Sequence, residues 1–293
     1  MQRRLSAQRP KHTGAAPRRP SAAALHNGHT GNSNKRMFFR RQPPSFLITS
    51  RNIQRAEIDT DVGSIYLIRH GQASFGADDY DVLSPVGVRQ AEVLGEHLEQ
   101  LGIGLDRCVS GSLRRQQHTA NAALQRMSNA PALDIDEAFN EFDADAVIRT
   151  LLPDLLPEEP EALHILRNGA QNRAEFQRLF AKLIHRWISG EHDKPGLQSW
   201  QAYVEQVEGG LRRILEQAGS KQNIAVFTSG GTITALLRLI TGVPSAKAFE
   251  LNWQIVNTSL SQLKFRGSEV SLASFNSHVH LQLLKAPELI TYR

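Results

Sequence analysis

The stretch SIYLIRHGQ, residues 64–72, decides the fold. Its first five residues form a short apolar run rich in β-forming side chains, and polar residues follow at once. Such a run predicts a buried strand that ends in a polar loop. In open α/β sheets, reactive side chains gather just beyond the carboxyl ends of the strands. We therefore expect Arg69 and His70 at a functional edge of a sheet.

Strand and helix signals alternate after this stretch. Ser84 and Pro85 predict the start of a helix, because Ser is a favoured N-cap and Pro suits the first helical position. Gly102 predicts its end. The further expected elements are strands at 106–110 and 224–228, helices at 113–127 and 232–241, and a hairpin of 259–265 with 269–275. This order predicts an α/β fold with a mostly parallel central sheet and helices on both faces.

A helical stretch at about residues 146–217 interrupts the alternation. Its apolar side chains recur on one helical face, which predicts a helical cap packed on the body and not a separate domain. In this position the cap would select the substrate. Seven of its side chains are candidates for the mouth of the site, with surface or packing roles as the alternative: Arg149, Arg167, Arg173, His185, Trp187, Trp200 and Tyr203.

Residues 1–56 differ in composition from the rest of the chain. They hold twelve Lys or Arg residues and no acidic residue, since Glu57 is the first. The sequence predicts a disordered basic extension, because it cannot bury enough apolar surface to offset the entropy of ordering. A transit peptide, a basic tail that touches anionic surfaces and a plain unstructured extension all stay open. Residues 57–293 form the predicted folded domain.

Charge and composition limit the classes of partner. Without the twelve N-terminal charges, the net charge of +5 becomes −7 for residues 57–293, so we expect no nucleic-acid binding by the folded domain. No apolar run is long enough to predict a membrane span. The one cysteine, Cys108, excludes an intramolecular disulfide and fits a reducing compartment. We expect a cytoplasmic protein, with mitochondria as the alternative, and leave a homodimer open.

Four segments resemble the histidine phosphatase superfamily, also called the phosphoglycerate-mutase-like family. They are residues 67–72 (LIRHGQ), 109–120 (VSGSLRRQQHTA), 139–142 (FNEF) and 226–232 (VFTSGGT). The first is similar to the Arg-His-Gly signature of the family. All four occur in family order, and the resemblance covers about residues 64–280. It implies the same α/β fold and a phosphatase that acts on a small phosphorylated substrate.

The resemblance also implies roles for individual residues. Arg69 and Arg115 would bind the phosphate, because guanidinium groups match phosphate oxygens bidentately. His70 would attack phosphorus, and Glu141 would protonate the leaving alcohol and then activate water. Gly71 would let the backbone turn close to the phosphate. Two more side chains could add hydrogen bonds to it, Gln72 and Ser74.

Neither a metal nor a cofactor is expected, because the two arginines supply the positive charge. The acidic residues of the loop after His70 superficially suggest a cation site, but their spacing matches no familiar ligand pattern. We interpret them as a solvated loop. They are Asp78, Asp79 and Asp81.

The sequence departs from the family pattern most clearly at Ser229, and less so at Ala73 and Gly76, where many relatives carry a hydroxyl and an amide side chain. Ser229 stands where the second catalytic histidine is expected, and a serine cannot carry a positive charge. The amides of Gly230 and Gly231 at a helix start could bind the phosphate as well. His118, His278 and His280 are candidates to replace the histidine in space, with structural roles as the alternative. The sequence therefore favours a metal-independent phosphomonoesterase with a phosphohistidine at His70. A catalytically weak domain that binds a phosphorylated ligand is the alternative, and a phosphoglycerate-mutase-type phosphotransferase is a lesser one.

Overall fold

A computed structural model describes residues 61–74, 81–168 and 172–292 of the chain. These residues belong to one compact unit. The expected disordered extension, residues 1–56, lies outside the described residues, and so do Asp78 and Asp79. Within the described part, no helix has the length and apolar character needed to cross a membrane.

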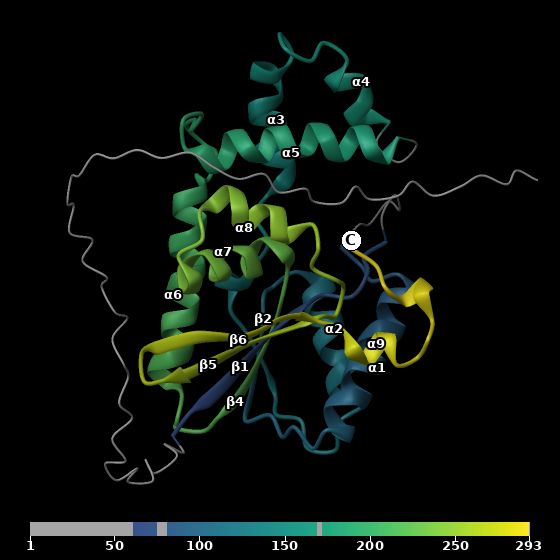
Figure 1. The fold of residues 1–293 in the computed structure, drawn as a ribbon, viewed down its shortest axis with the longest axis vertical. Coiled ribbons are helices and arrows are strands. Elements are labelled where there is room, and N and C mark those ends of the chain that lie inside the picture. The colour runs from purple at the N-terminus through teal and green to yellow at the C-terminus, as the bar shows by residue number, and fades with distance from the viewer. Residues whose placement is uncertain (1–60, 75–80, 169–171, 293) are drawn as a thin grey trace, which may run out of the picture. The chain divides into compact units, whose positions relative to one another are not determined.

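The described strands form one six-stranded sheet in the order β3-β2-β4-β1-β5-β6 (Figure 1). The strands are β1 (Gly63–Arg69), β2 (Arg107–Ser110), β3 (Leu133–Ile135), β4 (Asn223–Thr228), β5 (Leu260–Arg266) and β6 (Glu269–Ser277). β1 to β4 pair in parallel, whereas β5 and β6 add an antiparallel edge. This arrangement confirms the predicted α/β fold. The sequence did not predict β3, because its three residues include a central acidic one and carry no apolar run.

Helices fill most of the remaining described chain. They are α1 (Pro85–Gln100), α2 (Arg114–Leu124), α3 (Ala144–Leu155), α4 (Ala162–Arg167), α5 (Arg173–Ser189), α6 (Trp200–Gln217), α7 (Gly230–Thr241), α8 (Ser245–Asn252) and α9 (Val279–Gln282), with short 3₁₀ turns η1 (Glu137–Phe139) and η2 (Pro287–Leu289). The predicted start of α1 is confirmed, because the Ser84 hydroxyl accepts a hydrogen bond from the Gly87 amide at 3.1 Å. Gly102 follows its end with φ of +64°, which glycine adopts at little cost.

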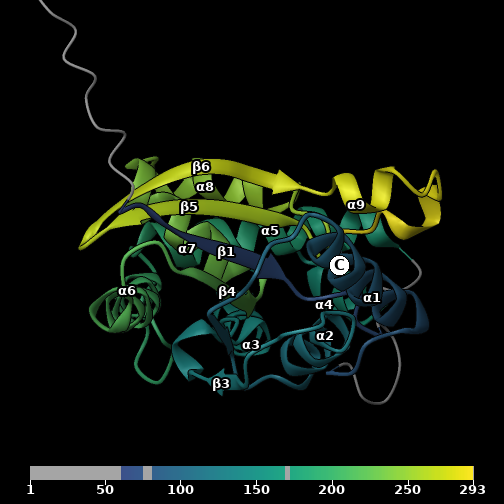
Figure 2. The same ribbon diagram turned by 90° about the horizontal axis from the view of Figure 1, so that it is seen from below.

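Alternating side chains of the central strands bury both faces of the sheet. On β1, Ile65 and Leu67 enter the larger core, which α5, α6 and α7 help to form. Ile68 enters a second core with Cys108 of β2 and side chains of α1 and α2. The period of two along a strand explains this division. Figures 1 and 2 show α6, α7 and α8 on one side of the strands and α1, α2 and α9 on the other.

Helices α3 to α6 occupy the range of the predicted cap. Their large aromatic side chains pack inward, so that Trp187, Trp200 and Tyr203 have exposed fractions of only 1%, 4% and 0%. Each aromatic polar group is satisfied internally; the Trp187 indole, for example, donates to the Gln198 carbonyl at 2.7 Å. These three aromatic residues therefore have a packing role and do not line the mouth of the site. The four other mouth candidates are exposed: Arg149, Arg167, Arg173 and His185.

Candidate active site

His70 lies directly after β1 with its ring buried. Its amide donates to the Thr228 carbonyl of the neighbouring strand at 2.8 Å, and its carbonyl accepts from the Asn257 side chain at 2.9 Å. Ring atom Nδ1 is 2.7 Å from the Gly71 carbonyl oxygen. Because a carbonyl only accepts, Nδ1 must carry the proton in this contact, and Nε2 keeps a lone pair. The backbone thus selects the nitrogen that can act as a nucleophile.

Arg115, in the first turn of α2, lies against this lone pair. Its Nε is 3.3 Å from Nε2 of His70, and its Nη1 binds Oδ1 of Asp81 at 2.6 Å. Asp81 also accepts from the backbone amide of Arg114 at 2.8 Å. Burial, and then the charges of Arg115 and Arg69, hold the pKa of His70 well below its usual range. The imidazole is therefore neutral near pH 7.

Asp81 corrects one expectation from the sequence. We interpreted the acidic loop after His70 as solvated, but this carboxylate fixes the start of α2 and orients Arg115. The two residues are 34 positions apart, and no local pattern connects them. The other two aspartates of the loop lie outside the described residues.

Arg69, the last residue of β1, reaches toward the start of α7. Its guanidinium donates to the carbonyl of Ile255 and, at 3.2 Å, to the carbonyl of Tyr292. A Cβ built at Gly230 would be 3.9 Å from Arg69 Nε. Both arginines implied by the resemblance thus flank His70, one from β1 and one from α2.

The loop after His70 packs tightly on α1. A Cβ at Gly71 would collide with the carbonyl group of Gly87, so only glycine fits. The side chain of Gln72 accepts from the Ser84 hydroxyl at 2.8 Å and so engages the start of α1. The Ser74 amide donates to the Val82 carbonyl at 2.9 Å. These contacts fix the loop, whereas hydrogen bonds from Gln72 and Ser74 to a phosphate stay a prediction.

Glu141 faces the start of α7. Its Oε2 accepts from the Gly231 amide at 3.0 Å, and its Oε1 accepts from the Phe142 amide at 3.2 Å. A Cβ at Gly231 would collide with the carboxylate, which explains the glycine there. Burial raises the pKa of Glu141, although Gly231 and the charges of Arg115 and Arg69 oppose the shift. A raised pKa suits a group that must hold a proton.

Ser229 is fully buried before α7, and its partner is a residue that the sequence did not single out. Its Oγ accepts a hydrogen bond at 2.8 Å from Nε2 of Gln116, which also donates to the Phe139 carbonyl at 3.0 Å. Gln116 is fully buried as well. Because the amide occupies one lone pair of the hydroxyl, Ser229 keeps its own proton to donate. The only available signal was a large polar residue on the buried face of α2, directly after Arg115.

A chain of hydrogen bonds supports the loop after His70. The Gln72 amide donates to Oε1 of Gln90, and Nε2 of Gln90 donates to the Thr291 hydroxyl, both at 2.8 Å. Thr291 then donates to Oδ1 of Asn257, whose Nδ2 donates to the His70 carbonyl, both at 2.9 Å. All donors point the same way around Gly71, so each bond polarises the next.

The histidines considered as replacements lie elsewhere. His118 is exposed on α2. His278 bonds to the Asn276 carbonyl at 2.9 Å. Nε2 of His280 is 3.1 Å from the Thr258 hydroxyl, and its ring packs near His97 at 5.8 Å. His118 thus faces solvent, while His278 and His280 make contacts of their own, and the equivalence of Ser229 with the family's second histidine stays a prediction.

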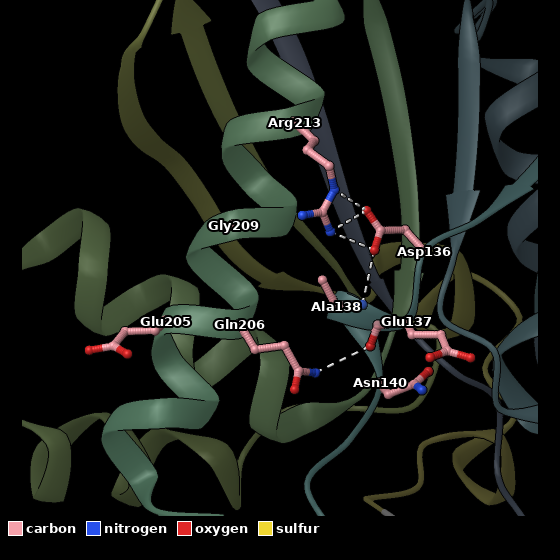
Figure 3. A pocket seen from close by; sticks show the side chains of 8 residues that line it. All are labelled: Asp136, Glu137, Ala138, Asn140, Glu205, Gln206, Gly209 and Arg213. Atoms are coloured by element: carbon pink, nitrogen blue, oxygen red, sulfur yellow. Dashed lines mark hydrogen bonds and ion pairs between the residues drawn. The ribbon is translucent and has the colours of Figure 1, made fainter.

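A cavity of about 520 Å³ opens between η1 and α6 (Figure 3). Its wall includes Arg213, which binds both carboxylate oxygens of Asp136, and Gln206, which donates to the Glu137 carbonyl at 3.2 Å. Asn140 borders the cavity directly before Glu141. The cavity therefore lies behind the Glu141 loop, and none of the expected site residues lines it. In the described part of the chain, no group of three or more His, Cys, Asp or Glu residues could hold a metal ion.

Comparison with known proteins identifies the relatives of this chain. The family model of the histidine phosphatase superfamily (branch 1) matches residues 65–175 and 167–278. The mitochondrial serine/threonine-protein phosphatase Pgam5 of Drosophila yakuba is 32% identical over 118 residues, which are 40% of this chain and 40% of that protein. Pgam5 of Drosophila melanogaster matches to the same extent. The chain thus spans about two fifths of the length of these relatives.

Solved structures of low sequence identity share the fold. Phosphoglycerate mutase from Bacillus anthracis superposes with a TM-score of 0.54 at 18% identity, over 78% of this chain and 98% of that one. Phosphoserine phosphatase from Entamoeba histolytica, in complex with 3-phosphoglyceric acid, gives 0.51 at 21% identity, over 75% and 99%. These likenesses support the phosphoglycerate-mutase-like fold predicted from the sequence.

Proposed function

Because this chain belongs to the histidine phosphatase superfamily, we propose that it hydrolyses phosphomonoesters through a phosphohistidine at His70. One observation carries the proposal. Nδ1 of His70 is tied to the Gly71 carbonyl while Nε2 meets Arg115, so a neutral nucleophile stands beside a cation. Such a pair can attack an anion whose charge is neutralised at the same place.

Phosphate binding is assigned to the two arginines and to the start of α7. Arg69 and Arg115 would each contact phosphate oxygens, with no metal needed for charge neutralisation. The Gly230 amide and the Ser229 hydroxyl would add neutral donors at the helix N-terminus. Gly71, Gln72 and Ser74 complete the proposed contacts in the loop after His70.

The first chemical step forms the phosphohistidine. The Nε2 lone pair of His70 attacks phosphorus, and the bond between phosphorus and the ester oxygen breaks. Glu141 gives its proton to the departing oxygen and becomes a carboxylate. Its raised pKa supports this role, because the proton is retained to higher pH than on an ordinary glutamate.

The second step hydrolyses the phosphohistidine. The Glu141 carboxylate takes a proton from a water molecule as that water attacks phosphorus, and the bond from phosphorus to His70 Nε2 breaks. Inorganic phosphate leaves, His70 regains its lone pair and Glu141 is protonated again. The nucleophile and the acid are thus both restored.

The predicted replacement of a family histidine by Ser229 favours a second candidate function. Loss of one charged donor from such a site lowers the rate by about a hundredfold or more. In the alternative, the domain binds a phosphorylated ligand tightly and turns it over poorly. A mutase-type transfer is a weaker alternative, because a mutase must hold its phosphoryl group between two half-reactions. This proposed site has one cationic donor fewer than the family pattern provides.

The test is release of phosphate from a panel of phosphomonoesters by the full chain with chelator present. We expect turnover that is lost in His70→Ala and kept in His118→Ala, a matched change at an exposed histidine. Acid quenching during turnover should trap an acid-labile phosphoryl group on the wild type and none on His70→Ala. Tight phosphate binding without His70-dependent turnover would replace this proposal by the binding alternative.

We also propose where the protein is located in the cell and how the chain divides into parts. The mitochondrial naming of the Pgam5 relatives and the lack of acidic residues before Glu57 support a mitochondrial protein over a cytoplasmic one. In this proposal, residues 1–56 contain the mitochondrial targeting signal and residues 57–293 form the phosphatase domain. A fluorescent fusion of the full chain should co-localise with mitochondria, and a fusion of residues 57–293 should not.

A further inference from the structure

Three half-buried aromatic side chains form a group that the fold leaves partly open to solvent. Phe176 and Phe180, one turn apart on α5, stack with ring centroids 6.0 Å apart and an interplanar angle of 17°. Trp253, just after α8, meets Phe180 edge-on at 5.9 Å and 82°. We call these residues the aromatic triplet. It differs from Trp187 and Trp200, which are buried in the core.

The chain around Trp253 touches the proposed phosphate site on both sides. One residue before it, Asn252 lies against α7, since a Cβ at Gly230 would come within 2.5 Å of Asn252 Oδ1. Two residues after it, the Ile255 carbonyl accepts from the Arg69 guanidinium. Two residues of chain span at most about 7 Å. Trp253 therefore lies on a short bridge, residues 252–255, whose ends contact Gly230 and Arg69, two residues assigned to phosphate binding.

This bridge is held in place by Asn276 at the end of β6. Its Nδ2 donates to the Gln254 carbonyl at 2.5 Å, and its Oδ1 accepts from the Val256 amide at 2.8 Å. The Gln254 amide also donates to the Leu251 carbonyl at 2.9 Å. A fixed backbone presents the ring without a large ordering cost on binding.

Three basic side chains of α5 and α8 are engaged by carboxylates. Arg178 and Lys182 both bind Glu159, and Lys247 binds Glu250 at 2.9 Å. These cations are balanced, so they add little net charge for a second anionic group of a substrate. The triplet offers aromatic faces and edges instead.

We infer that the aromatic triplet receives an aromatic leaving group, so that aryl phosphates are the preferred substrate class of the site. The inference rests on the proposed function, because the phosphate of the ester would lie on Arg69 and Arg115. A flat ring can pack in an offset or edge-on arrangement with Trp253 and Phe180, an interaction that adds to the area buried. A polar alkyl group such as glycerol gains little there.

Binding of an intact ester tests the inference without turnover. In a His70→Ala background, calorimetric titration should show phenyl phosphate binding more tightly than glycerol 2-phosphate. Adding Trp253→Ala should weaken phenyl phosphate by about tenfold and leave glycerol 2-phosphate within about twofold. Trp253→Phe should retain most of the preference. Leu101→Ala, at an exposed apolar residue after α1, is the matched control and should change neither affinity.

The inference is overturned if Trp253→Ala weakens both esters equally or neither, with circular dichroism showing that the variant is folded. A wild-type preference for glycerol 2-phosphate would overturn it too. Failure of the proposed function looks different, since the wild type would then release no phosphate while the calorimetric preference is still measured. In an active wild type, Trp253→Ala should raise KM for phenyl phosphate about tenfold with little change in kcat.

Discussion

Strands β1 and β4 lie side by side and end at the same edge, yet their loops differ in charge. The two strands pair in register up to Arg69 and Thr228. β1 ends with the guanidinium of Arg69, the proposed nucleophile His70 follows it, and Arg115 adds a second cation against His70. Beyond β4 come a hydroxyl and two glycine amides, one of which binds Glu141. In the proposed mechanism, neutralisation of phosphate is thus concentrated at one strand end, and proton transfer at the other.

The loop after β4 bears on the predicted replacement of a family histidine by Ser229. Ser229 fills less space than an imidazole, and the Gln116 side chain enters from α2 to bond with it. If Ser229 stands at the family's second histidine, as the sequence predicts, a pair of neutral groups takes the position of a cation. In the proposed mechanism the β1 end should carry most of the rate enhancement.

The largest loss is expected at the cationic end, for Arg115→Lys. Lysine keeps the charge but cannot bind His70, Asp81 and a phosphate oxygen from one planar fork. We expect kcat/KM for phosphomonoesters to fall about a thousandfold. Steady-state kinetics check this, with the neighbouring exposed Arg114→Lys as control, which should stay within about threefold. If kcat/KM of Arg115→Lys falls no more than that of the control, the positive charge that binds phosphate is not concentrated at the β1 end.

The second-largest loss is expected for Glu141→Gln. Its kcat should fall about a hundredfold, because the leaving oxygen loses its proton source. The pH profile sharpens the assignment. Activity needs neutral His70, whose pKa is lowered, and protonated Glu141, whose pKa is raised. Wild-type activity should therefore fall as pH rises through the Glu141 pKa and fall again as pH drops through the His70 pKa. The alkaline limb should be missing in Glu141→Gln, and its persistence would assign the proton to another group.

At the neutral end, smaller effects are expected. Ser229→Ala removes one hydroxyl donor and should lower kcat about tenfold. Ser229→His alone should not help, because Gln116 occupies the space beside it. Combined with Gln116→Ala, it should raise kcat about tenfold above the Ser229→His single variant. Equal rates for the single and double variants would mean that Gln116 does not stand in the way of a histidine.

The smallest effect is expected for the outer hydrogen-bond chain. Thr291→Val breaks the connection between Gln90 and Asn257, so the loop on both sides of Gly71 should loosen. We expect kcat to fall about threefold with KM unchanged, and hydrogen exchange of the Gln72 amide to become faster. Thr291→Ser should restore both values, whereas Thr241→Val, at the end of α7, should change neither. Exchange at Gln72 that is as slow as in the wild type would exclude this positioning role.

The sequence predicted those features of the fold that depend on interactions between residues close together in the chain. The apolar run of β1, the N-cap of α1 and the glycine after it were all readable, because each depends on residues within one or two turns. The partners of the site were not readable, since Gln116 meets Ser229 across 113 positions and Asp81 meets Arg115 across 34. The packing of Trp187 depends likewise on the folded core and not on its own helix.

Cys108 is an unreactive thiol on β2, the strand next to the β3 edge of the sheet. Its thiol is fully buried on β2, and burial, with the charge of Asp134, raises its pKa to about 12. Because it is the chain's one cysteine, thiol reagents have no other point of attack. A folded molecule should therefore resist alkylation and oxidation, and any covalent mark on the sulfur would record that β2 had separated from its neighbours. Modification of this thiol can therefore be used to report opening of the sheet at β2.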